Sequence, residues 1–129
     1  KIRTDFVTNS SSVSYILTMC KEMVDIYHGQ YFSDSTNIKD KRIFALLYDD
    51  ILKNGTRVML EGKELYSKMI TFHTNDCMDD DSYGKPIEKV DFSKFSDEEL
   101  WFYIFGEYIL KGKISYELRG LGITQVETH

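Results

Sequence analysis

Apolar residues recur at helical spacing over residues 39–54, which predicts a helix with one apolar stripe and charged residues on the other side. Five residues form the stripe: Ile43, Phe44, Leu47, Tyr48 and Ile51. This spacing is typical of a helix that packs one face on a core. Asn54 and Gly55 predict its end, because glycine readily adopts the left-handed conformation that terminates many helices.

A less regular apolar spacing predicts a second helix from residue 20 to about residue 29. Met23, Ile26 and Tyr27 fall on one side of this segment. Residues 29–37 lack a clear apolar period, and we expect a loop there between the two helices.

Strands are predicted where β-branched and aromatic residues cluster. Residues 13–19 form one such run. Residues 56–60 and 64–73 form two more on either side of Glu61-Gly62-Lys63, a sequence that favours a hairpin turn.

The C-terminal part predicts two further strand segments. Residues 113–119 alternate strictly between apolar and polar types, which is the pattern of a half-buried strand. Gly120 and Gly122 predict a bulge or turn, after which residues 123–126 resume the strand.

A third helix is predicted to begin after Ser96, because Ser96 and Glu99 match a capping box that satisfies backbone N–H groups at a helix start. The run "LWFYIFGEYIL" that follows places Leu100, Tyr103 and Leu110 on a second apolar stripe beside the main face. A helix that is apolar on two sides must be covered on two sides. Either it packs centrally in its own fold, or the second stripe binds a partner chain.

Together these elements predict an α+β fold: a mostly antiparallel sheet of about four or five strands with two to three helices. The length of 129 residues predicts a single domain over residues 1–129, large enough to bury its own core.

Charge is unevenly distributed along the chain. Residues 1–70 hold ten Lys and Arg against nine Asp and Glu, whereas residues 71–129 hold six against twelve. An acidic half repels phosphate backbones, so we expect no direct nucleic-acid binding and favour a protein partner, one with a basic surface.

The longest apolar run, residues 100–105, is too short to span a bilayer, and no secretory signal pattern is present. We therefore expect a cytoplasmic protein that does not enter a membrane.

His73, Asp76 and Cys77 form the one constellation that resembles a catalytic site. A reactive thiolate needs a neighbouring base, and a metal site needs further ligands at fixed geometry. No CxxC motif or second histidine pair accompanies these residues, so we expect no metal and no cofactor. Cys20 and Cys77 are expected to be structural thiols rather than a disulfide.

The acidic run "DCMDDDSYG" partly resembles a calcium-binding loop. Counted from Asp79, Gly84 occupies the required glycine position, but Tyr83 and Val90 stand where oxygen ligands are needed. A solvated acidic loop over residues 74–95 is the expected structure, with contact to a basic partner as the functional alternative.

The N-terminal stretch "KIRTDFVTNSSSVSYIL" resembles the N-terminal signature of small uncharacterised proteins of anaerobic bacteria, chiefly clostridia, and their phages, which runs K-I/F-R-x-x-F-V-T/S-N-S-S-S-S-S-F/Y and is followed by a strand. Matching positions are Lys1, Ile2, Arg3, Phe6, Val7, Thr8, Asn9, Ser10, Ser11, Ser12, Ser14 and Tyr15, and Val13 departs from the serine run. The resemblance covers about seventeen residues and implies no activity, cofactor or catalytic residue. From the residues themselves, Asn9 and the serines favour a turn before the first strand; an anion nest and a modification tag are the alternatives.

Two functions follow as expectations. The first is a non-catalytic accessory or inhibitor protein, encoded by a phage or mobile element and comparable to anti-CRISPR proteins, which binds a protein partner and can form homo-oligomers. Its partner-binding residues are expected to be Asp79, Asp80, Asp81, Tyr83, Leu100, Tyr103 and Leu110. The alternative is a small enzyme or ligand-binding domain that uses His73, Asp76 and Cys77.

Overall fold

Strand β1 (Ser12–Cys20) occupies the interior of a four-stranded sheet and pairs on both sides. The computed structural model describes residues 11–34 and 37–126; for residues 28–34 it describes the backbone alone. The sheet has the order β2-β3-β1-β4, and every neighbouring pair is antiparallel. Residues 1–10, on which the turn expected before the first strand depends, lie outside this part of the chain.

Two helices follow β1 in succession. Helix α1 (Lys21–Asp34) is longer than expected and includes residues 29–34, for which the sequence predicts a loop. Helix α2 (Ile38–Asn54) confirms the prediction from the apolar stripe and buries Ile43, Leu47 and Ile51. Asn37 caps its start by accepting the Asp40 N–H through its side chain at 3.2 Å.

The predicted hairpin is confirmed by β2 (Thr56–Leu60) and β3 (Lys63–His73). Its turn contains Glu61 and Gly62, both with positive φ, 50° and 79°. Two consecutive residues with positive φ match the turn type whose twist suits a two-residue hairpin.

The segment between β3 and the next helix contains three short 3-10 turns, η1 (Asp80–Tyr83), η2 (Ile87–Lys89) and η3 (Phe92–Lys94). Helix α3 (Asp97–Tyr103) then begins at the predicted capping box, where Ser96 and Glu99 exchange hydrogen bonds of 3.0 and 3.1 Å. The same helix continues into a π-helical segment, η4 (Ile104–Ile109), which the sequence did not predict.

The prediction of a strand at residues 113–119 is wrong. Helix α4 (Ile114–Glu117) lies there, and β4 begins only at Leu121 and ends at Val126. Ile114 and Leu118 are both buried, and the interval of four residues between them places them on one side of a helical turn. The same apolar residues, Ile114 and Leu118, therefore fit a short helix as well as a half-buried strand.

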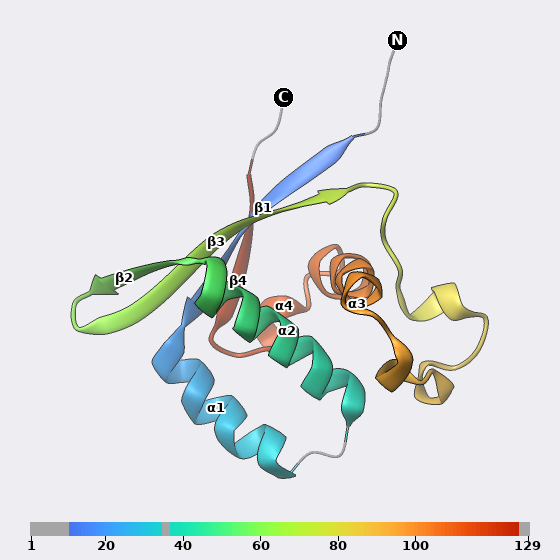
Figure 1. The fold of residues 1–129 in the computed structure, drawn as a ribbon, viewed down its shortest axis with the longest axis horizontal. Helices are drawn as coiled ribbons and strands as arrows, with labels where there is room; N and C mark the ends of the chain where they lie inside the picture. The colour runs from blue at the N-terminus through green and yellow to red at the C-terminus, as the bar shows by residue number, and fades with distance from the viewer. Residues whose placement is uncertain (1–10, 35–36, 127–129) are drawn as a thin grey trace.

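The helices lie on one side of the sheet (Figure 1). Strand side chains that face them form the core with the helices, among them Tyr15, Leu17, Met19, Ile70 and Phe72. Phe72 stacks on Phe105 of η4, with ring centroids 4.5 Å apart. The α+β class and the antiparallel sheet of four strands are thus confirmed, with four α-helices in the described residues against the two to three expected.

Candidate functional site

The proposed catalytic residues lie at the end of β3 without forming a catalytic arrangement. The backbone N–H of Asp76 donates to the His73 carbonyl at 3.0 Å and closes a turn. Cys77 is an exposed free thiol, in contrast to the buried one expected. Within residues 11–34 and 37–126, no hydrogen bond or ion pair joins the three side chains, and no group of three or more His, Cys, Asp or Glu could hold a metal ion.

The acidic segment is largely exposed to solvent, as expected, but it contains short 3-10 turns, and hydrogen bonds hold part of it against the protein. Asp79 accepts the N–H of Asp81 at 3.0 Å and forms a capping box with Ser82. Asp80 accepts a hydrogen bond from the Tyr103 hydroxyl. Two of the three aspartates therefore serve the fold, and Asp81 is left as the exposed one.

Most of the apolar residues expected to bind a partner are also internal. Leu100 and Tyr103 are buried in the core, so the second stripe of α3 is covered by the protein itself. Tyr83 is half-buried against Phe95 and Tyr103, and burial raises the pKa of its hydroxyl to about 12. Of the second stripe only Leu110, which is 54% exposed, is available to a partner.

Glu107 holds the acidic segment to η4, and the sequence analysis did not identify it. Its side chain is 2% exposed and pairs with both Lys111 and Lys113. It also accepts the backbone N–H of Asp80 at 2.9 Å. Burial alone would raise the pKa of Glu107, but the hydrogen bonds from both lysines and from Asp80 outweigh it and lower the pKa to about 2.

The spacing of Glu107 and Lys111 was a signal that could have been used. A glutamate with a lysine four residues later favours a helical ion pair, and Glu107 is the single charged residue in an otherwise apolar run. A lone carboxylate in such a run must find partners when it is buried.

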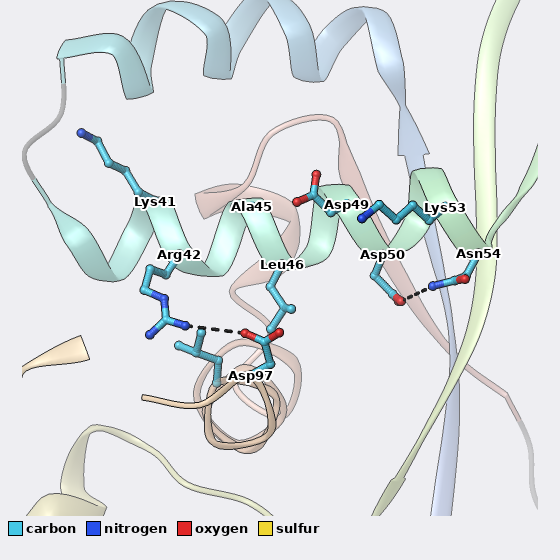
Figure 2. A pocket seen from close by; sticks show the side chains of 10 residues that line it. Lys41, Arg42, Ala45, Leu46, Asp49, Asp50, Lys53, Asn54 and Asp97 are labelled. Carbon is cyan, nitrogen blue, oxygen red and sulfur yellow. Dashed lines mark hydrogen bonds and ion pairs between the residues drawn. The ribbon is translucent and has the colours of Figure 1, made fainter. Parts of the chain in front are cut away.

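A hollow between α2 and α3 is lined by charged side chains of both signs, of which Arg42 and Asp97 form an ion pair with each other. Figure 2 shows Arg42 pointing from α2 toward Asp97, with 3.6 Å between the charged groups, and Asp50 bonded to Asn54. The Arg42 guanidinium also donates to the carbonyls of Phe92 and Phe95 at 2.7 and 2.6 Å. This arginine therefore anchors η3 to α2.

The edge of β3 that faces away from β1 is open beyond the end of β2. The hydrogen bond from the Thr74 N–H to the Ser11 carbonyl fixes which β3 residues bond to β1, and by alternation these are the even-numbered ones. The odd-numbered residues bond to β2, whose pairing stops at Ser67. Met69, Thr71 and His73 thus direct their backbone groups outward, and apart from the His73 carbonyl these groups have no hydrogen-bond partner among the described residues.

A groove runs along this open edge. It has a volume of about 380 Å³ and is lined by β3 from Lys68 to His73, by Trp101 and Phe102 of α3, and by Asp50 and Asp76. Lys68 pairs with Asp50, so their charges are mutually satisfied. Asp76 has no ion pair with any described residue. Cys77 does not line the groove.

No described helix or strand covers the face of the sheet opposite the helices, and we call it the open sheet face. Among its described outward strand positions, Lys63 at the hairpin end is the one Asp, Glu, Lys or Arg, and it pairs with Glu22. Four of its apolar side chains are exposed to solvent: Ile16, Val58, Leu60 and Met69. Ser and Thr occupy most other positions, and Ser14 bonds to Thr71 through their hydroxyls at 2.8 Å.

Comparison of the chain with protein-family models, with curated proteins and with solved structures found no match. No helix in the described part of the chain is long and apolar enough to cross a membrane.

Proposed function

We propose that the protein is a non-catalytic protein-binding domain and that the open sheet face is its binding surface. The observation that carries this proposal is the chemistry of that face. Met69 is 58% exposed and Leu60 is 56% exposed, on a surface whose described outward strand positions include a single charged residue, Lys63 at the hairpin end. Soluble proteins rarely leave contiguous apolar surface uncovered unless it binds something.

The remaining surface supports the same choice by contrast. It carries most of the charged side chains, and some of these pair within the fold, as with Arg57 and Glu64 at 3.3 Å. The residues first expected to bind a partner mostly serve the core or the caps. The proposal therefore keeps a protein partner and moves its contact surface from the acidic segment to the sheet.

Site-specific photo-crosslinking in cells tests this proposal. A crosslinking amino acid at Met69 or Val58 is expected to give a discrete adduct with another protein. The same amino acid at Leu110, whose exposure of 54% matches that of Met69, is the control and should give none. Adducts formed at Leu110 or Asp81 but absent from both sheet positions would contradict the proposal.

A further inference from the structure

We propose that the open edge of β3, from Met69 to His73, binds an extended segment of a partner protein by adding it to the sheet as a further strand. This inference rests on the proposed protein-binding function and specifies how and where one partner segment is held. The added strand would lie in line with β2, on the side of β3 that β2 leaves unpaired beyond Ser67.

The backbone of β3 supplies the first argument. The N–H and C=O groups of Met69 and Thr71 and the N–H of His73 point outward without a partner in the described chain. An extended peptide satisfies this alternating pattern of donors and acceptors, because its own backbone groups repeat with the same period. Met69 and Thr71 are exposed, so a strand can approach them.

The groove beside the edge supplies the second argument. Trp101 packs against Phe72 with ring centroids 6.2 Å apart and forms part of the wall of the groove with Phe102. Alternate side chains of an added strand would face this aromatic wall, so apolar residues are favoured at those positions.

Charge defines the occupant further. Lys68 and Asp50 neutralise each other, which leaves the Asp76 carboxylate as the unpaired charge at the His73 end of the groove. Asp76 is half-buried. A partner segment with a Lys or Arg at this end would complement it, and an acidic residue there would be repelled.

The test selects peptides from a displayed library of random dodecapeptides on the intact protein. Selected peptides are expected to alternate apolar and polar residues and to carry a basic residue near one end. Met69→Pro removes one outward N–H and leaves the bonds to β1, so it should weaken these peptides at least tenfold. Gln125→Pro is the matched control on the open side of β4, and it should change their affinity less than twofold.

Charge reversal tests the orientation of the segment. Asp76→Lys should weaken the selected peptides at least fivefold, and selection repeated on this variant should yield acidic ends instead. Peptides that bind Asp76→Lys and Met69→Pro as well as the unchanged protein would overturn the inference.

A measurement on the unchanged protein removes dependence on the folding of the variants. Amide hydrogen exchange at Met69, Thr71 and His73 should slow on peptide addition, while Ile70 and Phe72, which already bond to β1, change little. Peptides that bind without this protection refute the edge site and leave protein binding intact. A library that yields no binder also refutes the edge site, and absence of crosslinks at Met69 and Val58 then refutes the proposed function separately.

Discussion

At the scale of single residues, Glu107 decides how the segment after β3 is held. Its carboxylate is enclosed by η4 and accepts hydrogen bonds from two lysines and from the Asp80 backbone. A buried charge is tolerated when it is paired and fully hydrogen-bonded, and it becomes costly once a partner is removed.

Glu107→Gln is expected to lower the free energy of unfolding by about 2–3 kcal/mol at pH 7. The folded pKa of about 2 lies below the ordinary value of 4.5, so the ionised group stabilises the protein above pH 4.5 and loses this effect as the pH falls toward 2. Urea unfolding at several pH values should show the two proteins converging in acid. Glu88→Gln, an exposed control, should behave like the unchanged protein, and a difference for Glu107→Gln that is independent of pH would contradict this account.

Gly106 is a second residue whose identity is dictated by a neighbour. A Cβ added there would lie 2.3 Å from the Met78 carbonyl oxygen, where η4 meets the acidic segment. We expect Gly106→Ala to lower the free energy of unfolding by at least about 2 kcal/mol, because backbone must move. Gly84→Ala meets no atom within 4 Å and should cost only about 1 kcal/mol through its positive φ. If thermal unfolding shows that Gly106→Ala and Gly84→Ala lose the same free energy of unfolding, the proposed clash is refuted.

At the scale of elements, local chemistry predicted some boundaries and missed others. The capping box at Ser96 and the hairpin turn at Glu61-Gly62 depend on residues that are close together in the chain, so both could be predicted from the sequence. The π-helical segment was not predicted, and within it Gly106 lies against Met78, a residue far away in the chain that the local sequence does not identify. Residues 113–119 satisfied both a strand and a helix pattern, and packing decided between them.

Arg42 links two elements and offers a test at this scale. Arg42→Lys should lower the free energy of unfolding by about 1–2 kcal/mol and speed amide exchange in residues 92–96. Arg42 bonds to the carbonyls of Phe92 and Phe95 through Nη1 while its Nη2 faces Asp97, and a lysine, with a single nitrogen, cannot serve both sides. Arg57→Lys alters an exposed ion pair with Glu64 and should change stability by less than about 0.5 kcal/mol. Unchanged exchange in residues 92–96 would show that the clamp is dispensable.

At the scale of the molecule, the candidate site could not be predicted from the sequence. Ile16, Val58 and Met69 come from three strands and meet on one face only through the register of the sheet. Their chemistry is that of core residues, so composition alone assigns them to the interior. Asp79, Asp80 and Tyr103 showed the opposite error, since their pattern suggested a surface and their partners lie within the fold.

The open sheet face makes a prediction about the protein by itself. Met69→Lys should leave the free energy of unfolding within about 0.5 kcal/mol of the unchanged protein, because the side chain is already exposed. The charge of the new lysine should nevertheless abolish the crosslink to a partner protein that a crosslinking amino acid at position 58 forms. A large loss of stability in chemical denaturation would show that the face belongs to the core.

The interior position of β1 also determines the order in which the strands of the sheet can pair during synthesis of the protein. Ser14 pairs with Thr71 on one side and with Val126 on the other, so both partners are translated long after the strand itself. Contacts this distant in sequence slow folding, since a long loop must close before they form. On the ribosome β1 therefore waits with both edges unpaired, first for the hairpin and then for β4, and a nascent chain that lacks β4 exposes one edge of β1 to chaperones or to other chains.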